Sequence, residues 1–192
     1  MVVCYPKWEL PDEFIGNWQQ DGEYWSPEYT RRYYKWFIVF KDVRVKILLD
    51  YFNEDIGELP EILLSRLGDK IAKIMHGEQY SIITEVARGV IVETREILTS
   101  QGLAMAVYDL GILIAELLQR EYSSLCWTIR KSRGKIKDIY HNHPVLEGFN
   151  NNMAFDPLLT LLNISANILE NQSGVEKWIN IYNYYANAVL AK

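Results

Sequence analysis

One apolar stretch, residues 103–130, constrains the fold of this chain more than any other feature of its sequence. Its apolar residues recur at steps of three and four, which is the spacing of one helix face, and further apolar residues lie beside that stripe. A helix that is apolar around most of its circumference is surrounded by other helices. Asp109 and Glu116 interrupt the run before it reaches the roughly 20 residues of a membrane span. We therefore predict a buried central helix over 103–130.

Helix signals along the rest of the chain predict an all-α fold. Ser26, Pro27 and Glu28 supply a capping residue, a first-turn proline and a first-turn acid, so a helix is expected from here to about residue 53. A hairpin remains an alternative for 36–48, because this segment is rich in β-branched and aromatic residues. Further helices are expected at 59–76, 78–100, 156–170 and 175–190. The sequence thus predicts one all-helical domain spanning 1–192, an irregular bundle of about five to six helices.

Residues 1–26 form an irregular, aromatic-rich arm, and its apolar area predicts that it packs on the body. The 192 residues are enough for one sizeable core. No basic segment followed by an apolar one opens the sequence, so we expect a cytoplasmic protein without a signal peptide. Cys4 and Cys126 make neither a disulfide framework nor a zinc site, and Cys126 is expected to be buried on the central helix.

Charge is divided into blocks along the sequence. Residues 1–28 hold six acids and one base, a net of −5, whereas 30–46 hold six bases and one acid, a net of +5. Residues 50–61 hold five acids and no base, and 130–137 hold five bases and no acid. Either the acidic arm neutralises the basic helix, with about 0–1 kcal/mol from each exposed pair, or an acidic, aromatic surface faces a basic partner. The net charge of −5 argues against a nucleic-acid partner.

Sequence patterns for catalysis are weak. His141 and His143 form the only histidine pair, and with Asp138 and Glu147 they are the candidates for a metal-assisted hydrolase. Short histidine patterns of this kind are more often structural loops. The sequence contains no G-x-S-x-G element and no phosphate-binding glycine loop. We therefore predict that the chain is not an enzyme and that it holds no metal and no cofactor.

The predicted function is protein binding. An acidic, aromatic-rich domain without a catalytic motif fits an intracellular inhibitor, such as an immunity protein that neutralises a basic nuclease toxin in bacteria. No membrane partner is expected. A homo-oligomeric scaffold is an alternative, with a contact formed by Trp178, Tyr182, Tyr184 and Tyr185. The predicted partner-binding residues are acids and tryptophans of the arm: Glu9, Asp12, Trp18, Asp21, Glu23 and Trp25.

Overall fold

The computed structural model describes residues 5–14, 25–76, 80–87, 90–97, 101–132, 140–157 and 175–190. This part of the chain is mostly helical, as the sequence predicts, and its α-helices are α1 (Pro27–Phe52), α2 (Pro60–His76), α3 (Gln101–Glu121) and α5 (Val175–Leu190). Two antiparallel sheets pair β1 (Tyr80–Ala87) with β2 (Val90–Ile97) and β3 (Cys126–Ile129) with β4 (Pro144–Glu147). Two short 3-10 turns are η1 (Asp12–Phe14) and η3 (Asn150–Asn152). Within these ranges, no helix has the length and apolarity that crossing a bilayer requires.

The first helix begins and ends at the residues that its capping signals indicate. The Ser26 hydroxyl accepts the N–H of Tyr29 at 3.1 Å, and Pro27 occupies the first turn. At the other end, Asn53 takes the left-handed conformation (φ 52°) that terminates helices. The segment 36–48 is therefore helical and not a hairpin.

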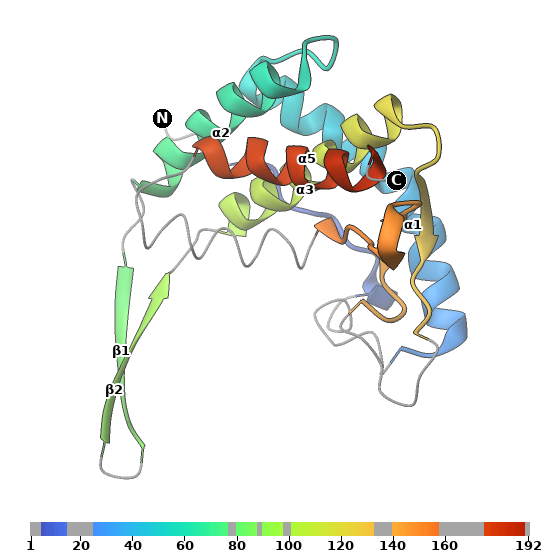
Figure 1. The fold of residues 1–192 in the computed structure, drawn as a ribbon. Helices are drawn as coiled ribbons and strands as arrows, with labels where there is room; N and C mark the ends of the chain where they lie inside the picture. The colour runs from blue at the N-terminus through green and yellow to red at the C-terminus, as the bar shows by residue number, and fades with distance from the viewer. Residues whose placement is uncertain are drawn as a thin grey trace.

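The centre of the core is α3, which packs against α1, α2 and α5 (Figure 1). Every residue from position 106 to position 118 is buried except Glu116, which is half-buried. The predicted central helix is thus present, but its end at residue 130 is wrong, because α3 stops at Glu121 and the chain turns into β3. Side chains alternate along a strand, so Trp127 is buried while its neighbour Cys126 is exposed. The expectation that Cys126 is buried is therefore also wrong.

A β-hairpin occupies most of the segment for which a helix at 78–100 was expected. Tyr80 pairs with Ile97 and Ala87 with Val90 in an antiparallel register. β-Branched residues are dense here, and they favour strands over helices. The hairpin extends away from the helical body (Figure 1).

The last helix, α5, packs mainly on α2. Its Trp178 is fully buried and lies directly over Gly68 of α2, where a Cβ atom would come within 2.5 Å of the indole ring. Glycine at 68 therefore lets the two helices approach closely. The helix expected at 156–170 falls outside the described residues beyond Pro157.

Candidate functional site

A buried ion pair holds the start of the arm against α1 and α3. Arg44 Nη2 lies 2.6 Å from Asp109 Oδ2, and Arg44 Nε lies 3.1 and 3.0 Å from the two carboxylate oxygens. The Tyr5 hydroxyl and the Trp8 indole N–H donate to the same carboxylate at 2.5 and 3.0 Å. Arg44 also donates to the carbonyl of Pro6 at 2.9 Å. Burial raises the pKa of Asp109, and the Arg44 guanidinium opposes that change.

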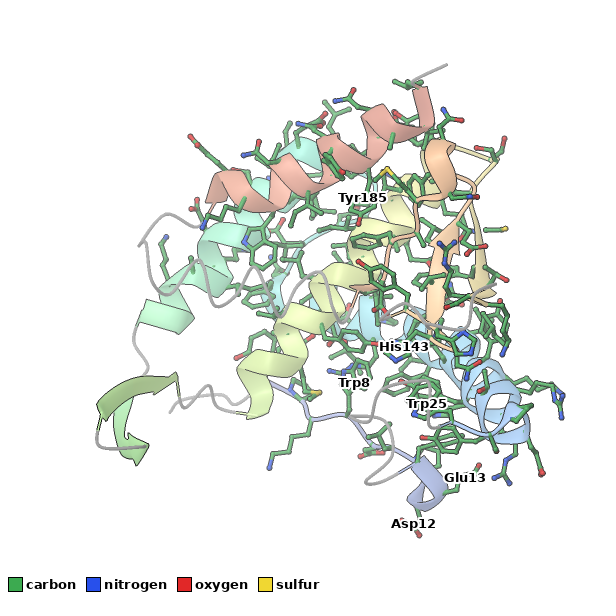
Figure 2. All side chains as sticks on the ribbon, turned by 60° about the horizontal axis from the view of Figure 1, so that its bottom comes forward. Trp8, Asp12, Glu13, Trp25, His143 and Tyr185 are labelled. Carbon is green, nitrogen blue, oxygen red and sulfur yellow. The ribbon has the colours of Figure 1, made fainter. Side chains whose placement is uncertain are left out.

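The aromatic residues of the described arm are turned inward. Trp8 packs on Tyr108 with ring centroids 4.2 Å apart, and Phe14 packs on the rings of α1. Trp25, a predicted partner-binding residue, is buried between α1 and the loop that carries His143. Figure 2 shows Trp8 and Trp25 directed toward the body, with Asp12 at its edge.

The other predicted arm residues divide into two groups. Glu9 and Asp12 are exposed, so their carboxylates face solvent. Trp18, Asp21 and Glu23 lie outside the described residues. The structure therefore places Glu9 and Asp12 at the surface of the arm, whereas Trp25 is buried.

The basic block of α1 is partly neutralised within the chain. Arg32 Nη1 lies 3.0 Å from Glu13 of the arm, which is the pairing that internal neutralisation predicts. Lys41 contacts Glu116 of α3 at 2.8 Å. Arg31 and Lys35 are exposed, and no described residue forms an ion pair with either.

The two histidines of the loop 140–143 have different partners. His143 Nδ1 lies 2.9 Å from Asp156 Oδ2, and its ring stacks on Trp25 with centroids 5.1 Å apart. The carboxylate selects the tautomer in which Nδ1 donates, which leaves Nε2 as an acceptor. Nε2 is buried and has no hydrogen-bond partner within the described ranges. His141 Nδ1 instead accepts the N–H of Ser132 at 3.0 Å.

These contacts differ from the metal site considered for this loop. Glu147 forms an ion pair with Arg130 at 2.8 Å, and Asp138 lies outside the described residues. The described part of the chain holds no group of three or more His, Cys, Asp and Glu side chains suited to a metal ion. The chemistry available at the loop is that of a His–Asp pair.

The connection between α1 and α2 carries a surface that the sequence analysis did not select. We call it the α2 patch, and it consists of Asp55, Glu58, Leu59, Glu61 and Ile62. Leu59 is 65% exposed and Ile62 is 48% exposed, although both are large aliphatic residues. Asp55 and Glu61 are exposed beside them, and neither forms an ion pair with a described residue. The patch therefore combines apolar anchors with uncompensated negative charge.

A polar hollow adjoins the patch. Its volume is about 400 Å³, and it is lined by Asn53, Glu54, Asp55, Glu58 and Arg66. Arg66 bridges Glu54, at 2.9 Å, and Glu58. These pairs neutralise Glu54 and Glu58 in part and fix the shape of the connection.

Negative charge continues from the patch toward the last residue of α3, Glu121. Burial, followed by the hydrogen bond to Glu121, raises the pKa of Tyr182, and Glu61 adds to that effect. The pKa of Tyr122 is raised for the same reasons. The acids 50–61 signalled this surface in the sequence, but only the structure shows that Leu59 and Ile62 are not used in the core.

Comparisons with known proteins give no relative for this chain. No family model matches it, and neither a curated protein nor a solved structure is significantly similar to it.

Proposed function

We propose that this chain is a non-catalytic inhibitor that binds a basic protein, in the way that an immunity protein neutralises a nuclease toxin in the bacterial cytoplasm. The α2 patch carries this proposal, because Leu59 and Ile62 are exposed beside Asp55 and Glu61, and neither acid forms an ion pair with a described residue. Buried apolar anchors supply most of the affinity at protein interfaces, and charges of opposite sign speed the encounter. A basic partner supplies the missing cations.

The arm has a secondary role in this proposal. Glu9 and Asp12 are exposed acids of the arm that steer the partner through long-range attraction, whereas Trp25 is buried and stabilises the fold. Charge steering acts on the association rate and weakens with salt. We therefore expect Glu9→Gln and Asp12→Asn to slow association at low salt while the dissociation rate stays the same.

Affinity capture with matched variants tests the proposal. The chain is immobilised and exposed to lysate of its native host, and retained proteins are identified by mass spectrometry. We expect one stoichiometric basic protein, released by high salt, whose activity the purified chain then inhibits in solution. Ile62→Lys places a cation inside the α2 patch, so it should abolish both capture and inhibition.

The matched control compares two glutamates in equivalent helix positions. Glu61 lies in the first turn of α2 and Glu176 in the first turn of α5, so reversing either charge has a similar local cost to its helix. Glu61→Lys should weaken binding, and Glu176→Lys should leave it unchanged. Equal effects of the two substitutions on binding would contradict the assignment of the surface. So would a partner that the Ile62→Lys variant still inhibits as strongly as the parent chain does.

A second candidate function, hydrolysis, rests on the His143–Asp156 pair. A histidine oriented by a carboxylate is a common general base, and its Nε2 is an acceptor without a partner in the described part of the chain. The metal-assisted version predicts a bound transition metal in the purified protein. Elemental analysis tests this, and loss of a hydrolytic activity on His143→Ala, but not on His141→Ala, would assign the base.

A further inference from the structure

The outer face of α1 exposes two valines that neither the core nor helix formation explains. Val39 is 71% exposed and Val43, one turn further along the helix, is 51% exposed. β-Branched residues are weaker helix formers than Glu or Lys, so a purely solvated position gains nothing from valine. The two valines lie near the middle of the 26-residue helix, which forms one edge of the body (Figure 1).

The charges on this face change sign along the helix. Arg31, Arg32 and Lys35 precede the valines, and Asp50 follows them. Lys46 pairs with Asp50 at 2.6 Å, and Asp42 pairs with Lys41 at 2.7 Å, so the second half of the face is close to neutral. The first half stays positive, because Arg31 and Lys35 have no ion-pair partner among the described residues.

We propose that this face binds a second copy of the chain through antiparallel packing of α1 on the partner's α1. A two-fold axis between positions 39 and 43 sets Val39 against the partner's Val43, and the same contact repeats on the other side of the axis. In this register Arg32 lies opposite the partner's Asp50, with Arg31 and Lys35 within about one turn of it. The apolar centre is therefore self-complementary, and the positive half of each face lies against the nearly neutral half of the partner's face, which holds Asp50.

The net charge of the chain also favours this face for a contact between two copies. Two chains of charge −5 repel each other, so a contact between copies needs a surface without excess negative charge. Of the four aromatics expected to form such a contact on α5, Trp178, Tyr182 and Tyr185 are buried and only Tyr184 is exposed. A single helix pair buries less than the roughly 1,200 Å² of a standard interface, so the dimer is expected to be weak and to depend on concentration.

Sedimentation equilibrium of the full chain tests the proposal. The mass is expected to rise from 22.5 kDa toward twice that value as the concentration increases through the micromolar range. The double variant Val39→Glu, Val43→Glu places like charges on the axis and should weaken association by roughly tenfold or more. Glutamate is the better helix former, so circular dichroism should show an intact helix. Ile62→Glu, an exposed aliphatic on another helix, is the control and should leave the dimer unchanged.

Charge reversal tests the register. Arg32→Asp alone and Asp50→Arg alone should each weaken association, and the two together should restore it, because an acid and a cation again lie opposite each other across the axis. A monomer at every concentration would overturn the proposal and leave the face to an acidic partner of another kind. A dimer that the valine and charge variants do not change would overturn it as well.

Discussion

At the scale of single residues, the Arg44–Asp109 pair is the most consequential contact in the described structure. Both side chains are buried, and the carboxylate also accepts from Tyr5 and Trp8. Removing one partner leaves an uncompensated buried charge, so Arg44→Met is expected to lower the free energy of unfolding by about 3–5 kcal/mol. Chemical denaturation measures this loss.

The double variant Arg44→Met, Asp109→Leu tests whether the loss comes from leaving one buried charge without its partner. Since both charges are then absent, it should recover part of the loss. Glu13→Gln is the exposed comparison, because the Glu13–Arg32 pair is solvated and its loss should cost less than about 1 kcal/mol. A loss for Arg44→Met no larger than that for Glu13→Gln would show that the buried pair does not hold the arm.

Buried tyrosines are expected to lower the stability of the folded chain at alkaline pH. Burial raises the pKa of Tyr29 to about 12 and also raises the pKa of Tyr5 and Tyr33. Each of these groups binds its proton more tightly in the folded state than in the unfolded chain, where the pKa is about 10. Their contribution is therefore fully present below about pH 10, and stability falls as the pH rises above that value.

Tyr29→Phe tests whether one of these tyrosines contributes to the loss of stability at alkaline pH. The Tyr29 hydroxyl is buried without a hydrogen-bond partner in the described structure, so its removal should not lower stability at neutral pH. It should also make the alkaline loss shallower, measured as the free energy of unfolding at increasing pH. A variant with the same alkaline slope as the parent would show that Tyr29 does not contribute to it.

At the scale of elements, local signals were sufficient where capping and periodicity agreed. Ser26 and Pro27 correctly predicted α1 even though 36–48 is rich in strand-forming residues. At 78–100, apolar spacing alone predicts a helix, but no capping signal supports it. The β-branched residues of this segment form the β1–β2 hairpin instead. The predicted end of α3 is wrong for a related reason, because Leu125 and Trp127 continue the apolar pattern although the helix has ended at Glu121 and β3 begins at Cys126.

The candidate site was less predictable than the fold. Charge blocks located the acids, but exposure depends on tertiary packing, which placed Trp25 inside and Leu59 outside. Contacts distant in sequence, such as His143 with Asp156 and Arg44 with Asp109, have no local signal at all.

The β1–β2 hairpin should differ from α3 in its hydrogen exchange. A two-stranded hairpin that extends from the body has little to stabilise it, whereas α3 is surrounded by other helices. Amides of Tyr80–Ala87 and Val90–Ile97 are therefore expected to exchange much faster than those at the centre of α3. Similar protection in both elements, measured by mass spectrometry, would mean that the hairpin has a stabilising contact.

The contact between α2 and α5 depends on the absence of a side chain at Gly68. A methyl group there would overlap the Trp178 ring, so Gly68→Ala is expected to cost about 1–3 kcal/mol despite the better helix propensity of alanine. Gly57→Ala is the matched control, because its Cβ would meet only the Asp55 side chain at 3.4 Å. Thermal unfolding of the two variants should show a clear loss for Gly68→Ala alone.

At the scale of the whole molecule, the two proposed surfaces lie in different places. The 26 residues of α1 extend about 39 Å, and the valines lie near the middle of that length, whereas the α2 patch follows its last residue. A dimer formed through α1 would therefore carry its two α2 patches toward opposite ends of the helix pair. Partner binding and self-association should not compete.

This separation predicts a complex of two chains with two partner molecules. Ile62→Lys should remove the partner and leave the dimer, whereas Val39→Glu with Val43→Glu should remove the dimer and leave one partner bound to each monomer. Light scattering of the purified complexes distinguishes these masses. If either set of substitutions removed both interactions, α1 and the α2 patch would form one surface, and the partner would bind across both.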